Sequence, residues 1–335
     1  MKIGIIGTRW GLMHVGGFRG AGAEVAALCG AQAERTREVA AREGIPLATV
    51  DVDEMCRAVD VVVVASPDAR HAEHVRAALD RGRPVLCEKP LATGESDAAR
   101  MAAWARASGR ACAVNFPYRC LPPVARLKAH IEGRPVTERV RHVACTIENA
   151  FAAAASDASG DMGGVSHLID AALWLAGGHP VWVHASIEGR PARSAALQVG
   201  VSTGALLVIT QIACSEPGIR GRWLVAGDSW EASFAGGYEP ARGGWSVSAV
   251  RLADASSTAE LAPGALPLPG RREPWAEAHV DTARHFLRAA AGGELAPLAG
   301  FDQGLAVQRV LAAALASDQR RARVDLAGPA GDGPQ

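Results

Sequence analysis

Residues 61–92 decide the fold of this chain, and they read VVVVASPDARHAEHVRAALDRGRPVLCEKPLA. Four consecutive valines are typical of a short strand that is buried on both faces of a parallel sheet. Ser66-Pro67-Asp68 ends that strand, because proline has no N–H for a ladder hydrogen bond. Residues 69–80 have the spacing of an amphipathic helix, which Gly82 ends. The apolar run from Pro84 to Cys87 predicts a second strand.

This strand, helix and strand form a complete βαβ crossover, which places Glu88-Lys89-Pro90 at the carboxyl end of the second strand. Ligands of open parallel sheets bind at the carboxyl ends of the strands. Pro90 restricts Lys89 to extended geometry and so fixes the direction of its side chain. The alternative is that Glu88 and Lys89 are a solvated surface pair, as most such neighbours are. The exit of a buried strand favours a functional site.

The length and composition predict a two-domain protein with a small-molecule partner. The 335 residues exceed one ordinary domain, and 49% of them are hydrophobic, which is enough for a sizeable core. Because 35 basic side chains balance 35 acidic ones, no basic surface is expected for nucleic acid or an acidic membrane.

The cysteines and the apolar stretches indicate a cytoplasmic protein. The seven cysteines are scattered and never form a Cys-x-x-Cys pair, which predicts reduced thiols with neither disulfides nor a metal site. No stretch approaches the ~18 consecutive apolar residues of a membrane span. No secretory signal is recognisable after Met1.

The first residues predict a dinucleotide-binding turn. Residues 3–6 form a buried strand, and Gly7-Thr8-Arg9-Trp10-Gly11 forms a tight turn into a helix from Leu12. Such a turn lets a pyrophosphate approach the positive end of the helix. The usual G-x-G-x-x-G pattern has glycine where this chain has Arg9, as if one residue were missing. Arg9 either binds a phosphate in its place or is an exposed turn arginine.

The end of the second strand, Glu24 to Gly30, bears on the choice of cofactor. It lacks the acidic residue that binds the ribose 2′-hydroxyl of NAD, and Arg35 and Arg37 follow shortly after. These features favour NADP(H) over NAD(H). Alternatively, the arginines are only the first turn of an exposed helix from Glu34.

Short strands alternate with helices over residues 1–120, which predicts a doubly wound α/β domain. Its last strand ends on Asn115, so Tyr118 and Arg119 just beyond it are candidates for substrate contact. Core packing is the competing interpretation of Tyr118.

Residues 121–326 are predicted to form a second, α+β domain. From Val136 the apolar residues alternate with period two, which indicates an antiparallel sheet with one covered face. An uncovered face would commonly be covered by another subunit, so a homodimer or homotetramer is expected. Residues 253–274 are predicted to be a long loop, and residues 327–335 a disordered tail.

One helix of the second domain, Ser166 to Leu175, carries His167 and Asp170 three residues apart and so on roughly the same side. The two side chains are candidates for the site, or they form only a local hydrogen bond.

Together these motifs resemble the Gfo/Idh/MocA oxidoreductases over nearly the whole chain. The resemblance implies an N-terminal Rossmann domain, a C-terminal domain with a large open and mainly antiparallel sheet, and a nicotinamide dinucleotide between them. It implies hydride transfer to or from a C–OH or C=O group of a sugar, polyol or biosynthetic intermediate. The matching stretches are residues 7–11, Ala65-Ser66-Pro67 with His71, Glu88-Lys89-Pro90, Tyr118-Arg119 and Gly163 to Asp170.

The resemblance also implies a role for each matched residue. Lys89 exchanges the proton, with His167 and Tyr118 as further catalytic residues. Arg119, His167 and Asp170 bind the substrate, and no metal takes part. The implied cofactor contacts are Gly7, Thr8, Arg9, Trp10, Gly11, Arg35, Ser66, Pro67, His71, Glu88 and Lys89.

Two departures from the family pattern leave alternatives open. The family often has an acid four residues before its helical histidine, where this chain has Gly163, and Asp161 is out of register. Residues 7–11 and 43–47 also resemble thiazolinyl imine reductases, which reduce a cyclic C=N with NADPH, although that branch tends to have histidine in place of Lys89. A further alternative is a non-catalytic dinucleotide-binding regulator, as in repressors of the same family.

Overall fold

The computed structural model of the protein describes residues 1–135, 137–150, 162, 164–189, 192–215, 218–239, 244–248, 250–254, 257–261 and 274–328. The chain forms two compact units. The first contains residues 1–120 and 275–308, and the second contains residues 121–274 and 309–335. The sequence analysis assigned residues 275–308 to the second domain, so their membership of the first unit is a difference from that expectation.

The first unit is built on a twisted parallel sheet. Its strand order, within the described residues, is β16-β6-β5-β4-β1-β2-β3. The order reverses at β1, which has β2 on one side and β4 on the other, and ligands bind at such a switch point. The valines of β4 are at most 1% exposed, as a strand covered on both faces requires. The parallel strands are β1 (Lys2–Ile6), β2 (Glu24–Cys29), β3 (Leu47–Thr49), β4 (Val61–Val64), β5 (Val85–Cys87) and β6 (Cys112–Val114).

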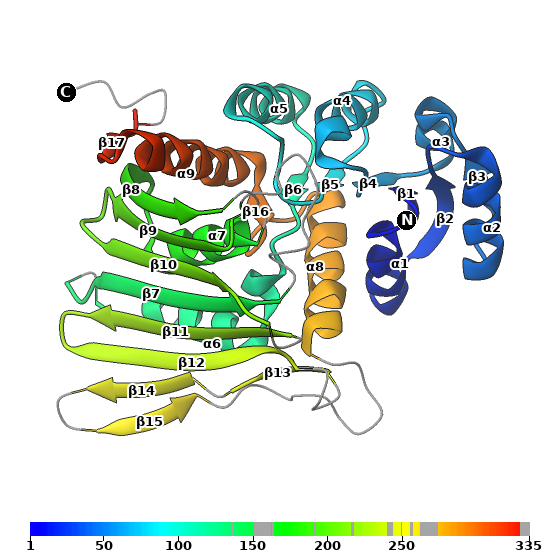
Figure 1. The fold of residues 1–335 in the computed structure, drawn as a ribbon. Coiled ribbons are helices and arrows are strands. Elements are labelled where there is room, and N and C mark those ends of the chain that lie inside the picture. Colours follow the sequence, from blue (N-terminus) through cyan, green and yellow to red (C-terminus); the bar gives the residue numbers. More distant parts are fainter. Residues whose placement is uncertain are drawn as a thin grey trace. The chain divides into compact units, whose positions relative to one another are not determined.

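Helices cover both faces of this sheet. The connections β1 to β2 and β4 to β5 run in opposite directions along the sheet, so right-handed crossovers put α1 and α4 on opposite faces, as Figure 1 shows. Short helical turns η1 (Asp68–Arg70) and η2 (Pro117–Cys120) follow β4 and β6. The helices are α1 (Gly11–Gly20), α2 (Ala33–Glu43), α3 (Val52–Ala58), α4 (His71–Asp80) and α5 (Glu95–Ser108).

The C-terminal segment completes the first unit with a helix and an edge strand. Helix α8 (Pro274–Ala290) packs against α1, where a Cβ on Gly17 would lie 3.1 Å from the carbonyl oxygen of His279. Strand β16 (Ala299–Gly300) pairs antiparallel with β6. No local pattern distinguishes a helix that packs on this sheet from one that packs elsewhere, which is why the sequence analysis did not place the segment here.

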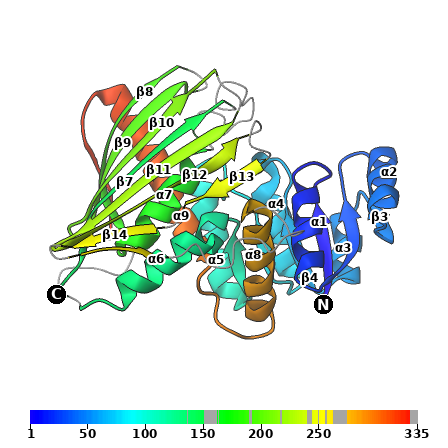
Figure 2. The same cartoon turned by 90° about the horizontal axis from the view of Figure 1, so that it is seen from below.

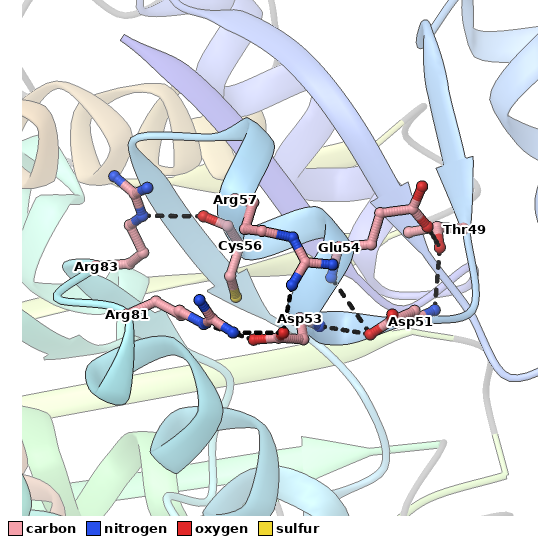
Figure 3. A network of polar contacts seen from close by, with 8 residues as sticks. All are labelled: Thr49, Asp51, Asp53, Glu54, Cys56, Arg57, Arg81 and Arg83. Carbon is pink, nitrogen blue, oxygen red and sulfur yellow. Dashed lines mark hydrogen bonds and ion pairs between the residues drawn. The ribbon is translucent and has the colours of Figure 1, made fainter.

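A network of polar side chains surrounds the first turn of helix α3 (Figure 3). Asp51 caps the helix, because its Oδ1 accepts the backbone N–H of Asp53 at 2.8 Å and that of Glu54 at 3.3 Å. The Asp53 carboxylate accepts two hydrogen bonds from Arg81, at 2.6 and 2.5 Å, and another from Arg57. The network therefore fixes α3 to the connection between α4 and β5.

The second unit is built on a large sheet with the order β15-β14-β12-β11-β7-β10-β9-β8-β17 in the described residues, with β13 paired to β12. β7 and β10 are parallel neighbours, and the other neighbouring strands described in this sheet are antiparallel. The bounds are β7 (Val140–Asn149), β8 (Pro180–Glu188), β9 (Ser194–Val201), β10 (Leu206–Ala213), β11 (Ile219–Gly227), β12 (Trp230–Glu239), β13 (Gly244–Val247), β14 (Val250–Asp254), β15 (Thr258–Leu261) and β17 (Val324–Asp325).

Helices α6 (Pro122–Glu132) and α7 (Val165–Ala176) lie on one face of this sheet, as Figure 2 shows. Helix α9 (Phe301–Arg320) is tied to β8 at its end, where Ser317 Oγ accepts the Ala185 N–H at 2.9 Å. On β7, buried Val143 and Cys145 alternate with the partly exposed Ala144 and Thr146. The expected open, mainly antiparallel sheet is therefore confirmed.

The prediction of one long loop over residues 253–274 is wrong in its first part. Strands β14 and β15 pair through residues 250–254 and 258–261. Small residues such as Ala253 and Ala259 give these strands little hydrophobic periodicity, which hid them in the sequence. Residues 329–335 of the predicted tail lie outside the described ranges.

Candidate active site

The switch point of the first sheet is formed by the loop from Gly7 to Gly11. Gly7 has a φ of +126°, which glycine adopts without strain, and a Cβ there would lie 2.2 Å from the carbonyl oxygen of Ala65. A Cβ on Gly11 would lie 2.8 Å from the Ile5 side chain. The chain therefore passes close against the end of β4, and a larger residue at either glycine would push the loop outward.

The residues between these two glycines face the outside of the loop's turn. Helix α1 begins at once: the Leu12 amide donates to the Arg9 carbonyl oxygen, and the Met13 amide donates to the Trp10 carbonyl oxygen, both at 3.1 Å. Arg9 is exposed, and Trp10 is 69% exposed. The loop thus lies at the amino end of α1, where the sequence predicts a phosphate contact.

The end of β2 has no room for an acidic side chain. A Cβ on Gly30 would lie 2.3 Å from Thr36 Oγ1, which itself donates to the Gln32 carbonyl oxygen at 2.7 Å. The residue that would bind a ribose 2′-hydroxyl is therefore excluded at this position. Arg35 is exposed in the first turn of α2.

Glu88 is held by three hydrogen bonds at the carboxyl end of β5. Its Oε1 accepts from His14 Nε2 at 2.8 Å and from Asn115 Nδ2 at 2.7 Å, and its Oε2 accepts the Lys89 backbone N–H at 3.2 Å. Burial raises the pKa of this carboxyl, but His14, Lys89 and Asn115 together outweigh burial and hold the pKa well below its usual range. Glu88 is therefore an ionised carboxylate that anchors the peptide of Lys89.

Lys89 is partly exposed, and its peptide bond to Pro90 is cis. Lys89 directly follows the anchored Glu88, just beyond the end of β5. This confirms that the Glu88-Lys89-Pro90 triplet lies at the carboxyl edge of the parallel sheet.

Aromatic rings from α1 and α8 pack beside Glu88. The His279 ring stands edge-on to His14 at 5.9 Å and to Trp275 at 5.5 Å, and Tyr118 packs edge-on against Trp275 at 5.7 Å. His279 is 7% exposed, and neither of its ring nitrogens has a hydrogen-bond partner among the described residues. Burial, with a smaller effect of His14, lowers the pKa of His279 to about 4, so its ring is neutral at pH 7.

The other candidates of the first unit are mostly buried. Tyr118 and Arg119 lie in η2, and Arg119 Nη1 donates to the Pro297 carbonyl oxygen at 3.2 Å. Ser66 is partly exposed at the end of β4, and its Oγ lies 2.8 Å from Nδ1 of His74. Burial and Arg70 lower the pKa of His74 to about 4, so this hydrogen bond involves a neutral ring.

His167 and Asp170 belong to the second unit, on helix α7. Asp170 is 1% exposed and His167 is partly exposed, so the two side chains differ in access to solvent. Asp161 and Gly163, which carry the departure from the family pattern, lie outside the described residues.

Four residues of this cluster were not recognised in the sequence as part of the site: His14 and Asn115, which bond Glu88, and His279 and Trp275, which pack beyond His14. A polar residue inside an otherwise apolar and glycine-rich helix was a usable signal for His14. Trp275 and His279 had no such signal, because their segment was assigned to the other domain.

A family model described as "Oxidoreductase family, NAD-binding Rossmann fold" matches residues 1–116 of this chain. Inositol 2-dehydrogenase 1 of Saccharopolyspora erythraea is 42% identical over 116 residues, which are 33% of this chain and 34% of that protein. The 1,5-anhydro-D-fructose reductase of Ensifer adhaerens is 33% identical over 150 residues, or 40% of this chain and 45% of that protein. The chain thus spans about a third to a half of the length of these curated relatives.

The fold agrees with solved structures over nearly the whole chain. A levoglucosan dehydrogenase in complex with NADH and L-sorbose superposes with a TM-score of 0.85 at 21% identity, covering 98% of this chain and 99% of that one. At this identity the likeness concerns the fold. Within the described ranges, no helix is both long enough and apolar enough to span a membrane.

The depressed pKa of His279 predicts a pH dependence of stability. The folded state resists protonation of this ring, so the unfolded state binds more protons between pH 6.5, the ordinary pKa, and about 4. His279 therefore contributes stability that is complete above pH 6.5 and is lost as the pH falls toward 4. We expect His279→Phe to flatten the fall in unfolding free energy over this window, measured by urea denaturation at a series of pH values. His184→Phe, which replaces an exposed histidine of the second unit, is the control, and an unchanged slope in His279→Phe would contradict the assignment.

Proposed function

We propose that this chain is a member of the Gfo/Idh/MocA oxidoreductases, whose family model matches its first 116 residues, and that it transfers a hydride between a nicotinamide dinucleotide and the C–OH or C=O group of a sugar or polyol. The observation that carries the proposal is the backbone of Lys89, anchored by the carboxylate of Glu88 at the edge where parallel sheets bind ligands. The names of the relatives, inositol dehydrogenases and an anhydrofructose reductase, support this substrate class.

The nicotinamide, when bound, supplies or accepts the hydride. In the proposed mechanism Lys89 donates or accepts the proton of the substrate oxygen, as its position at the strand end allows. Glu88 does not take part in the proton transfer. It fixes the backbone from which Lys89 projects, because its Oε2 accepts the Lys89 N–H while His14 and Asn115 hold its other oxygen.

The remaining proposed roles concern substrate orientation. His167 binds a substrate hydroxyl or shares its proton, and Asp170 supports this on the same helix. Tyr118 contributes to catalysis, and its ring packs edge-on against Trp275. Arg119 orients the substrate, and its Nη1 donates to the Pro297 carbonyl oxygen.

We propose NADP(H) as the preferred cofactor. The lack of space for a side chain at Gly30 removes the acid that would repel a 2′-phosphate, and Arg35 is exposed close by. The scyllo-inositol 2-dehydrogenase (NADP(+)) IolU of Bacillus subtilis, 31% identical over 138 residues, is a relative whose name includes this cofactor.

The two alternatives receive less support. An imine substrate was suggested by the short loop, whereas the relatives described above are named for sugar or polyol substrates. A non-catalytic regulator would have no need for Lys89 at an anchored strand end. Dinucleotide oxidation or reduction with a panel of inositols, levoglucosan, 1,5-anhydrofructose and a cyclic imine separates the three possibilities, and turnover of none of them would contradict the proposed activity.

We further propose that the open face of the second sheet joins two copies of the chain. Ala144, Thr146, Val208 and Leu224 lie on this face, and Leu224 is 36% exposed. Arg222, opposite Thr146, is an exposed charge on the same face. An open sheet face with apolar side chains is suited to an isologous contact with a second copy.

Lys89→Ala is expected to lower kcat on the order of 10²-fold, because proton exchange at the substrate is lost, while dinucleotide affinity changes little. Steady-state kinetics with the best substrate of the panel and dinucleotide titration by tryptophan fluorescence measure the two effects. Lys2→Ala, an exposed lysine at the start of β1, is the matched control. Full activity of Lys89→Ala would remove Lys89 from the chemistry.

Arg35→Ala is expected to weaken NADPH binding about tenfold and to leave NADH binding unchanged, since only NADPH offers a 2′-phosphate to a guanidinium. Calorimetric titration with both cofactors measures the preference. Arg37→Ala removes an equally exposed arginine two residues further on. Equal effects of the two substitutions would argue for general electrostatics and against a specific contact.

Leu224→Arg is expected to convert the oligomer into monomers, because it places a charge at the centre of the proposed interface. Light scattering coupled to size-exclusion chromatography measures the mass. Val50→Arg changes an exposed apolar residue, 52% exposed, of the first unit and should leave the mass unaltered. A wild-type protein that is monomeric at micromolar concentration would contradict this proposal.

A further inference from the structure

His71 is the first residue of helix α4, and its side chain is 1% exposed. Its Nε2 lies 2.9 Å from the carbonyl oxygen of Ser66, and its Nδ1 lies 3.1 Å from that of Pro90 and 3.3 Å from that of Leu91. Backbone carbonyl oxygens only accept hydrogen bonds, so the ring donates at both ends when it is doubly protonated, and a neutral ring donates at one end while the other nitrogen stays in contact. Both polar atoms of the ring are therefore occupied by the protein's own backbone.

These contacts join two segments that leave the sheet side by side. Strands β4 and β5 are paired up to Val64 and Cys87, and beyond that point the ladder ends. Ser66 lies on the segment that follows β4, and Pro90 and Leu91 lie on the segment that follows Lys89. The imidazole ring spans the two segments just where the sheet no longer holds them together.

A second histidine of the same helix strengthens one end of this bridge. His74 lies one turn after His71, and its Nδ1 is 2.8 Å from Ser66 Oγ. Helix α4 therefore holds Ser66 both at its carbonyl oxygen and at its hydroxyl. The segment after Lys89 is thus tied, through His71, to helix α4.

We propose that His71 is a positioning residue, which keeps Lys89 in its catalytic place by bridging the segments that follow β4 and β5, and which contacts neither the dinucleotide nor the substrate. The proposal rests on the function proposed above, since it assigns His71 a task that serves Lys89. It replaces the cofactor contact that the family resemblance implies for His71. Because a displacement of about 1 Å at a reacting group can cost on the order of 10²-fold in rate, a modest loosening of this bridge is enough to impair catalysis.

The test uses His71→Gln, which retains one N–H-bearing group but cannot reach both segments, and His71→Phe, which fills the space without any donor. His285→Gln is the control, because its ring contacts the Arg288 side chain and the Ala296 backbone, which belong to neither of the two bridged segments. The first measurement is hydrogen exchange by mass spectrometry of the backbone amides in residues 65–70 and 88–93. The second is kcat per dinucleotide-binding site, with the sites counted by titration, together with the Kd of NADPH.

We expect both segments to exchange faster in the two His71 variants and not in the control. We expect kcat per site to fall about tenfold or more, and the Kd of NADPH to change less than about threefold. A purely structural role would lower the number of folded sites and leave kcat per site unaltered, which would overturn the proposal. Unchanged exchange in residues 88–93 would overturn it too, and so would a large rise in Kd at constant kcat, which would indicate a direct cofactor contact.

The exchange measurement does not depend on turnover or on a bound dinucleotide. If the wild-type protein binds no dinucleotide, the proposed function fails, whereas faster exchange in both segments still supports the bridge. If the wild-type protein is active and exchange is unchanged in the His71 variants, only the bridge fails. His71→Gln keeps the test valid should His71→Phe not fold.

Discussion

A buried and ionised carboxylate is the constraint on which the first unit depends. An unpaired buried charge is costly, so Glu88 is tolerated only because hydrogen-bond donors converge on it. His14 comes from α1, Asn115 from the end of β6, and the Lys89 amide from the chain itself. These three donors tie a helix and two strands to one point at the carboxyl edge of the sheet. The position of the proposed catalytic lysine is therefore a consequence of charge burial in the scaffold.

The parts of the fold that could be predicted are those in which a local sequence pattern indicates the burial of the residues. Four valines in a row indicate a strand covered on both faces, and the structure has β4 there. The return of residues 275–308 to the first unit could not be predicted in this way. The amphipathic pattern of α8 shows that one face is buried, but it contains no information about which partner buries it. The short strand β16 is set by its neighbour β6, with no pattern of its own.

The candidate site likewise contains residues that the local sequence identifies and residues that it does not. The glycine loop and the Glu88-Lys89-Pro90 triplet were recognisable because backbone geometry demands those residues at strand ends. The anchoring of Glu88 was not, since its partners lie 74 and 27 residues away along the chain. His71 illustrates a third case. A motif can identify a residue as important while the contacts, here with the carbonyl oxygens of Ser66 and Pro90, suggest a different reason for its importance.

The division of the first unit between two distant stretches of chain affects how the protein is made. During translation the strands β1 to β6 emerge early, but α8 and β16 follow only after residues 121–274 have been synthesised. At translation rates of ~5–20 residues per second, the nascent sheet waits on the order of ten seconds or more before its last helix and edge strand leave the ribosome. Throughout that interval the α1 face and the outer edge of β6 lack their final cover, so the first unit completes its core only after residues 121–274 have been made.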